Sequence, residues 1–261
     1  MKRTPITAPL PQLPEAVRPF AEGAVIYDSS CSPEASVLFL DKGPGFFLKS
    51  APKGALKTEA ELTSWFSRKD LAPEVLVYES ADRDWLLTRA AGGEDCIHPE
   101  YLADPTRLCD TTAQLLRQLH ETDFSGCPVP DRTAAYKSTA EHNYRIGQYD
   151  LSLFPDNWGF STPEEAFTLV RQQGHLLETN TLLHGDYCLP NILLDNWKFS
   201  AFIDLGNGGV GDRHIDIFWG AWTLFFNLKT EKYCSRFLDA YGRDRIDMDM
   251  LRLVAAFEVF G

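Results

Sequence analysis

The sequence predicts an α+β protein with a small, β-rich N-terminal lobe and a larger, mainly helical C-terminal lobe. Short apolar runs separated by turn residues fill residues 25–89, and stretches with helical periodicity dominate beyond residue 91. The chain has 261 residues, of which 44% are hydrophobic, and this length favours more than one compact core. We therefore predict lobes at residues 1–90 and 91–261.

The N-terminal lobe is predicted to contain an antiparallel sheet and one helix. The runs "ASVLFL" and "GFFLKS" flank the turn "DKGPG", a pattern typical of a hairpin. The segment "TEAELTSWF" predicts a helix that opens with a capping box from Thr58 to Glu61. Two further strands, "EVLVYE" and "DWLLTR", follow with the turn "SADR" between them. The proline-rich residues 1–20 predict an extended lead-in.

The C-terminal lobe is predicted to be helical with one β interruption. Helices are expected over "PTRLCDTTAQLLRQLHET", after the N-cap Thr162 with Pro163 and Glu165, over "HIDIFWGAWTLFFNL" and at the chain end. Two short β runs around the turn "NWK" interrupt this pattern between residues 182 and 206.

Charge and composition narrow the range of partners. The formal net charge of -12 disfavours nucleic acid and anionic lipid and favours a cationic partner, such as a cationic small molecule, with a plain solubility surface as the alternative. The six cysteines form no C-x-x-C pair and no HExxH segment is present, so we predict neither a zinc site nor a disulfide framework. No apolar run has the length of a signal-peptide core or a membrane span, so we expect a cytoplasmic protein. The sequence leaves the oligomeric state open.

One stretch, "HGDYCLPNILLD" followed by "FIDLG", carries the predicted chemistry. It places Asp186, Asn191 and Asp204 within nineteen residues, at turns beside apolar β runs. Amide and carboxylate oxygens suit Mg²⁺, and a third carboxylate can orient a hydroxyl for phosphoryl transfer. Plain turn residues and metal-dependent hydrolysis with His184 are the alternatives, and the spacing favours transfer from ATP.

A nucleotide site also needs a cation for the phosphates. Lys49 ends the apolar strand "GFFLKS" and therefore requires a carboxylate partner. Glu59 shares a helix face with Leu62 and Phe66, so we predict that Glu59 points inward and pairs with Lys49. No P-loop motif is present, and Ser30 in the turn "DSSCSPEA" is a weaker phosphate-binding candidate.

With these residues in place, nearly the whole chain resembles the aminoglycoside 3′-phosphotransferase branch of the protein-kinase-like fold. The resemblance implies a bilobal fold, an N-terminal nucleotide-binding lobe, and ATP and Mg²⁺ as cofactors. It implies that Asp186 is the catalytic aspartate, that Asn191 and Asp204 bind the metal, and that Lys49 and Glu59 form the phosphate-positioning ion pair.

The resemblance extends to the adenine and acceptor contacts. Thr88 and Ala90 fall in the segment whose backbone reads adenine, and Asp216 matches a buried aspartate that braces the catalytic loop. Glu258, in the terminal "FEVF", and Asp156, in "PDNW", match acidic substrate positions.

Several departures from the family concern the acceptor side. Asn207 stands where Arg is usual, and Phe226, Asn227 and Phe257 stand where many members carry acids. The leading hypothesis is therefore an aminoglycoside resistance kinase, with a kinase of another metabolite, such as a sugar or amino alcohol, as the alternative. A protein kinase and a nucleotide-binding pseudokinase are weaker alternatives. The intact set of Asp186 and its partners argues against the pseudokinase, and the short "GNGGVGDRH" segment argues against a protein kinase.

Overall fold

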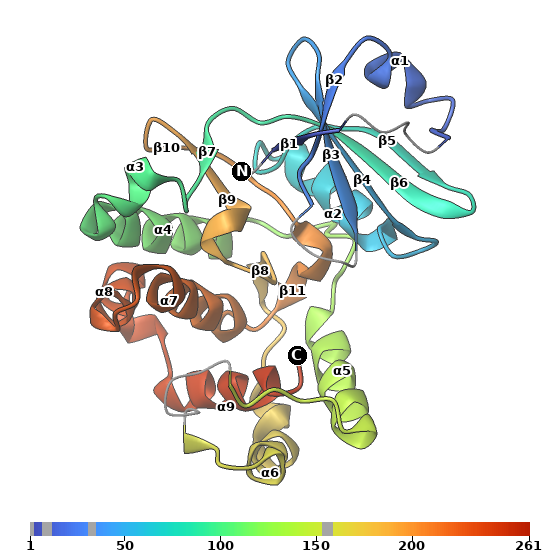
Figure 1. The fold of residues 1–261 in the computed structure, drawn as a ribbon. Helices are drawn as coiled ribbons and strands as arrows, with labels where there is room; N and C mark the ends of the chain where they lie inside the picture. The colour runs from blue at the N-terminus through green and yellow to red at the C-terminus, as the bar shows by residue number, and fades with distance from the viewer. Residues whose placement is uncertain (1–2, 7–11, 31–34, 153–158) are drawn as a thin grey trace. The chain divides into compact units, whose positions relative to one another are not determined.

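The computed structural model describes residues 3–6, 12–30, 35–152 and 159–261. The chain divides into two compact units, the first made of residues 1–98 and 190–206 and the second of residues 99–189 and 207–261. The predicted lobes of residues 1–90 and 91–261 stay a prediction. The mixture of an antiparallel sheet and a helical part confirms the predicted α+β class (Figure 1).

A six-stranded antiparallel sheet forms most of the first unit. Its order is β1-β2-β3-β4-β6-β5, and both predicted strand pairs, β3 with β4 and β5 with β6, are confirmed. The strands are β1 (Thr4–Pro5), β2 (Val25–Asp28), β3 (Ser36–Asp41), β4 (Phe46–Pro52), β5 (Val75–Ser80) and β6 (Arg83–Arg89). The predicted lead-in thus contributes an edge strand, and it also contains a short helix, α1 (Arg18–Ala21).

Strand alternation decides what each face of this sheet carries. Phe46 and Leu48 of β4 point to a core that Leu13 and Val17 of the lead-in cover. The intervening positions point the other way, and Ala51 packs there with Ala60 of α2 (Lys57–Ser67). Lys49 has the parity of Ala51, so the period of two places this lysine on the face that α2 covers.

Helix α2 begins differently from the prediction. Thr58 lies inside the helix, and the N-cap position is Leu56, whose side chain makes no capping bond. The Leu56 N–H instead donates to Oδ2 of the buried Asp84 at 2.9 Å. The predicted capping box of Thr58 and Glu61 is therefore wrong, because an acceptor from a distant strand satisfies the N–H that precedes the helix.

A second small sheet completes the first unit. Strands β9 (Ile192–Asp195) and β10 (Lys198–Phe202) form the predicted hairpin around Asn196 and Trp197, and β7 (Glu94–Asp95) pairs with β9. This hairpin matters for the site because its two open ends lead to the predicted metal-binding residues.

The second unit is mainly helical, as predicted. Its helices are α3 (Pro99–Leu102), α4 (Pro105–His120), α5 (Arg132–Ile146), α6 (Pro163–Gln173), α7 (His214–Leu228), α8 (Lys232–Tyr241) and α9 (Met248–Glu258), and its strands are β8 (Thr181–Leu183) and β11 (Gly209–Gly211). The Thr162 side chain caps α6 by accepting from the Glu165 N–H, as predicted. The sequence analysis did not foresee α5, although Asp131 caps its start and Gly147 its end. Within the described part of the chain, no helix is both long and apolar enough to cross a membrane.

Candidate active site

Lys49 is the centre of an ion cluster in the first unit. Its Nζ lies 3.0 and 2.9 Å from the two carboxylate oxygens of Glu59 and 2.7 Å from Oδ1 of Asp204. The structure therefore has the predicted pair of Lys49 and Glu59 and adds Asp204 to it. One lysine connects the central sheet, helix α2 and the segment that follows β10.

The electrostatics of this cluster depend on mutual compensation. Burial lowers the pKa of Lys49, but the charges of Asp204 and Glu59 outweigh burial and hold this pKa above its ordinary value. Burial also raises the pKa of Glu59, and Lys49 opposes that rise. The lysine is therefore firmly protonated, which suits a group that would face phosphate oxygens.

The β9–β10 hairpin places Asn191 and Asp204 side by side along the backbone. Asn191 precedes β9 and Asp204 follows β10, and the Ile203 N–H donates to the Asn191 carbonyl at 3.0 Å. Asp204 adopts a left-handed backbone with φ of 58°, which costs a non-glycine residue about 1 kcal/mol. Such strain is common where a side chain is held in a functional position.

Asp186 lies in a loop of the second unit that a buried aspartate braces. Asp216, which is fully buried in α7, accepts from the His184 N–H at 2.7 Å and from the Gly185 N–H at 2.8 Å. His184 Nδ1 in turn accepts from the Asp186 N–H at 3.3 Å. These bonds give Asp216 the bracing geometry that the resemblance implied, and they join the His184 ring to the backbone of the loop.

Further contacts fix the backbone on both sides of Asp186. Gly185 has φ of 84°, and a Cβ at this position would lie 1.8 Å from the Asn207 carbonyl oxygen, so only glycine fits. The Tyr187 hydroxyl donates to the Thr112 carbonyl at 2.7 Å, and the Leu189 N–H donates to Thr223 Oγ1 at 3.1 Å. Contacts within the protein thus anchor the loop on both sides of Asp186.

His120 also supports this loop. Burial lowers the pKa of His120, which favours the neutral ring. Its two ring nitrogens lie 2.8 Å from the Tyr241 hydroxyl and 3.3 Å from Oδ2 of Asp216. His120 is therefore a buried part of the brace and does not interact with the helix dipole as a charge.

Glu258, a predicted substrate residue, is buried in the second unit. Its Oε1 accepts from the Tyr136 hydroxyl at 2.7 Å and from Trp219 Nε1 at 3.0 Å. Burial raises the pKa of Glu258 to about 7, and the charge of Asp186 adds to this rise, whereas both hydrogen bonds and Arg132 oppose it. Tyr136 was not predicted as a site residue, because it lies on α5, a helix that was itself not predicted.

The remaining predicted site residues are Ser30, Thr88, Ala90 and Asp156. Ser30 is exposed and its Oγ accepts from the Val37 N–H at 2.9 Å. Thr88 belongs to β6, and the Ala90 N–H donates to the Gly45 carbonyl at 3.0 Å. Asp156 lies outside the described residues. The roles of all the predicted site residues toward ligands stay predictions.

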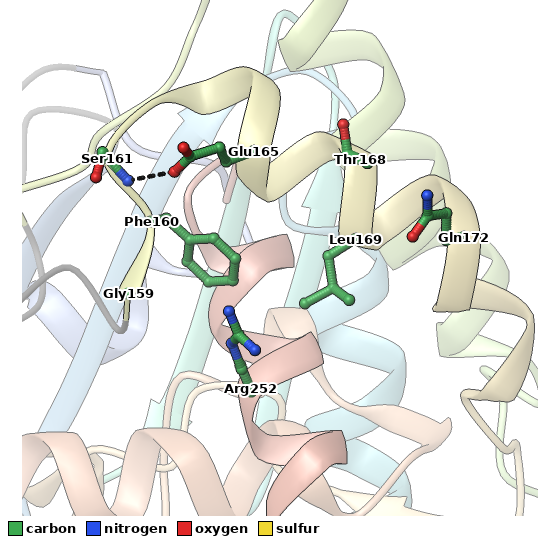
Figure 2. A pocket seen from close by; sticks show the side chains of 8 residues that line it. All are labelled: Gly159, Phe160, Ser161, Glu165, Thr168, Leu169, Gln172 and Arg252. Carbon is green, nitrogen blue, oxygen red and sulfur yellow. Dashed lines mark hydrogen bonds between the residues drawn. The ribbon is translucent and has the colours of Figure 1, made fainter.

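A hollow in the second unit lies apart from these residues. Figure 2 shows it along helix α6 and facing helix α9, with Arg252 directed toward Phe160, whose ring centroid lies 5.5 Å from the guanidinium carbon. Glu165, on its rim, accepts from the Ser161 N–H and so completes the start of α6. The lining includes neither Asp186 nor Glu258, so we do not assign the hollow to the active site.

The class of protein follows from these features together with the comparisons. A sequence model of the phosphotransferase enzyme family matches residues 33–254, so the chain belongs to that family. The predicted protein-kinase-like fold is confirmed by a crystal structure of an aminoglycoside-3′-phosphotransferase of type VIII. That structure has a TM-score of 0.72 and 25% identity, over 95% of this chain and 98% of the other. The chain is a phosphotransferase that acts on a hydroxyl group.

Two relatives specify the branch. The chain is 51% identical to a "probable aminoglycoside 3′-phosphotransferase" of Lactococcus lactis subsp. lactis (strain IL1403), over 96% of this chain and 95% of that protein. It is 31% identical to an aminoglycoside 3′-phosphotransferase of Niallia circulans, over 84% of this chain and 85% of that protein. The resemblance inferred from the motifs is thereby confirmed.

Proposed function

We propose that this protein transfers the γ-phosphate of ATP, with Mg²⁺, to a hydroxyl group of an aminoglycoside antibiotic in the cytoplasm. The observation that carries the proposal is the cluster in which Lys49 contacts both Glu59 and Asp204. Nucleotide phosphates require a cation such as the protonated Lys49, together with protein oxygens such as those of Asn191 and Asp204 for their Mg²⁺ ion. The relatives named for this activity match over nearly the full chain.

The donor atoms fit Mg²⁺ better than an all-protein metal cage. Among the described residues, no group of three or more His, Cys, Asp and Glu side chains is placed to hold a metal. Mg²⁺ keeps several waters and commonly takes one or two protein oxygens together with substrate phosphates. Asn191 and Asp204 would hold the ion, which when bound neutralises charge on the transferred phosphoryl group.

We infer direct, in-line transfer in which this chain's residues orient the reactants. The acceptor oxygen forms a bond to the γ-phosphorus while the bond between that phosphorus and the β,γ-bridging oxygen breaks, and ADP leaves. Asp186 accepts the hydroxyl proton. Lys49 binds phosphate oxygens and Glu59 fixes its direction. The loop around Asp186 is pre-positioned by Asp216, so little reorganisation is needed.

A second candidate acceptor, a sugar or amino alcohol, is favoured by one observation. Phe226 is exposed at the end of α7 where many family members carry an acid. A surface without that carboxylate has less attraction for an ammonium group.

Acceptor-dependent ADP release tests the proposed function. Purified protein with ATP and Mg²⁺ would be assayed with a panel of aminoglycosides, with Asp186→Ala as the blank. Release stimulated by kanamycin or neomycin and absent in the variant supports the proposal. ATP binding without stimulation by any aminoglycoside overturns it in favour of a metabolite kinase.

A further inference from the structure

Three aromatic side chains on α7 form a continuous row in the second unit. Trp219, Trp222 and Phe226 follow the spacing i, i+3 and i+7, which places them on one helix face. The Trp219 and Trp222 rings meet edge to face at 5.2 Å between centroids, and the Trp222 and Phe226 rings stack at 4.8 Å with planes 16° apart. We call these three residues the α7 aromatic row.

The inner end of the row is hydrogen-bonded to Glu258, a predicted substrate residue. Trp219 Nε1 donates to Glu258 Oε1 at 3.0 Å, so a partly buried hydrogen bond fixes the first ring of the row. Burial raises the pKa of Glu258 to about 7, and the charge of Asp186 adds to this rise.

The outer end of the row is open and already accepts a cation. Phe226 is 48% exposed, and Lys229 Nζ lies 4.2 Å from the centroid of its ring. The exposure of Phe226 shows that the row is not wholly part of the core. The row thus leads from the surface toward Glu258.

The part of α7 that carries the row has no acidic side chain to pair with an ammonium group. The segment from Trp219 to Lys229 contains no Asp or Glu. Asn227, at the end of α7, donates from Nδ2 to the Thr223 carbonyl at 2.8 Å and so serves the helix. A cationic acceptor that reaches this face would therefore meet ring faces and no carboxylate from α7.

We propose that the α7 aromatic row is the stacking surface for an amino-sugar ring of the acceptor, with a substrate ammonium held over the Phe226 ring. This inference rests on the proposed function and names a subsite for it. The negative face of an aromatic ring attracts both C–H groups and ammonium groups. Such a surface binds a cationic ring without a carboxylate, and Lys229 occupies the position that the substrate ammonium would take.

Calorimetric titration of kanamycin and neomycin into wild-type protein and Phe226 variants tests this subsite. Phe226→Leu keeps an apolar side chain but removes the ring, and Phe226→Tyr keeps the ring. We expect Phe226→Leu to weaken binding about 5-fold, the loss expected for an exposed cation–π contact, and Phe226→Tyr to bind like the wild type. Phe124→Leu, at a 36% exposed aromatic position outside α7, is the matched control and should not change the affinity.

A second variant tests the competition with Lys229. Lys229→Gln removes the internal cation from the ring, so kanamycin should bind about 2-fold to 5-fold more tightly. If the row served only to pack the protein, Lys229→Gln would leave the affinity for kanamycin unchanged or would weaken it. Thermal melting of each variant confirms that Phe226→Leu and Lys229→Gln remain folded.

The outcomes separate this inference from the proposed function. Weaker binding by Phe226→Leu alone supports the subsite. Equal affinities of the wild type and Phe226→Leu overturn the subsite, and the proposed function stands when the wild type still releases ADP with kanamycin. Absence of kanamycin and neomycin binding by the wild type overturns both.

Discussion

Two buried glutamates, one in each unit, solve the same physical problem differently. Glu59 shares its charge with Lys49, whose Nζ lies within 3.0 Å of both of its oxygens. Glu258 instead accepts hydrogen bonds at Oε1 from two neutral donors, the Tyr136 hydroxyl and the Trp219 indole. Burial raises the pKa of both side chains, and for Glu258 the rise reaches about 7.

The difference shows that the two units hold a buried carboxylate by different chemistry. The first unit uses full charges in a fixed order of strand, lysine, helix and glutamate, so its pattern is readable in the sequence. The side near Glu258 uses aromatic rings and neutral hydrogen-bond donors. Burial raises the pKa of Glu258 to about 7, whereas at Glu59 the charge of Lys49 opposes the rise that burial causes.

Removal of the predicted catalytic carboxylate should have the largest effect. Asp186→Ala is expected to reduce turnover about 1000-fold or more, because the acceptor proton loses its base, with ATP affinity close to that of the wild type. Turnover and ATP binding would be measured on the same preparation. Asp82→Ala, in an exposed turn, is the control, and wild-type turnover in Asp186→Ala would refute the catalytic assignment.

The titration of Glu258 should appear as a pH dependence of stability. Because its pKa is raised from 4.5 to about 7 in the folded protein, the folded state binds more protons than the unfolded chain between these values. Stability therefore falls as the pH rises through this window, by up to about 3 kcal/mol from this group. Urea unfolding at about pH 5 and about pH 8 should show this loss in the wild type and a smaller one in Glu258→Gln. Identical pH dependence in the two proteins would show that Glu258 is ionised throughout.

Loss of the lysine on the nucleotide side should matter less than loss of Asp186. Lys49→Ala is expected to lower kcat/KM for ATP about 30-fold, because the phosphates lose one positioning cation and Glu59 is left buried without its partner. Lys53→Ala, an exposed lysine just beyond β4, serves as the control and should behave like the wild type. An unchanged kcat/KM in Lys49→Ala would separate the ion cluster from nucleotide chemistry.

The smallest effect is expected at the anchor of the catalytic loop. Thr223 Oγ1 accepts from the Leu189 N–H, and Thr223→Val would leave that buried donor without its acceptor. We expect a loss of about 1 to 2 kcal/mol in the free energy of unfolding and a partial loss of turnover. Thr223→Ser keeps the oxygen and should recover most of both. Equal stability of the valine and serine variants would contradict this role.

The sequence was informative where charge and periodicity act locally. The parity of Lys49 along its strand and the helical position of Glu59 both follow from short-range geometry, and the structure joins these two side chains. The motif around Asp186 likewise gave the hairpin that places Asn191 beside the residues preceding Asp204. In these places neighbouring residues decide the structure.

Prediction failed where distant residues decide. The start of α2 depends on Asp84, which lies in β6 and accepts from the Leu56 N–H. The surroundings of Glu258 depend on Tyr136, which comes from a helix more than one hundred residues earlier in the chain. No local pattern encodes such pairings, because the partners meet only after the helices pack.

The most direct test of the account is the fate of the γ-phosphate. Phosphorus NMR of a reaction with ATP, Mg²⁺ and kanamycin or neomycin should show a new phosphate monoester on the antibiotic, formed together with ADP by the wild type and absent with Asp186→Ala. Inorganic phosphate as the sole product, or a monoester formed equally by both proteins, would contradict transfer to an aminoglycoside hydroxyl by Asp186.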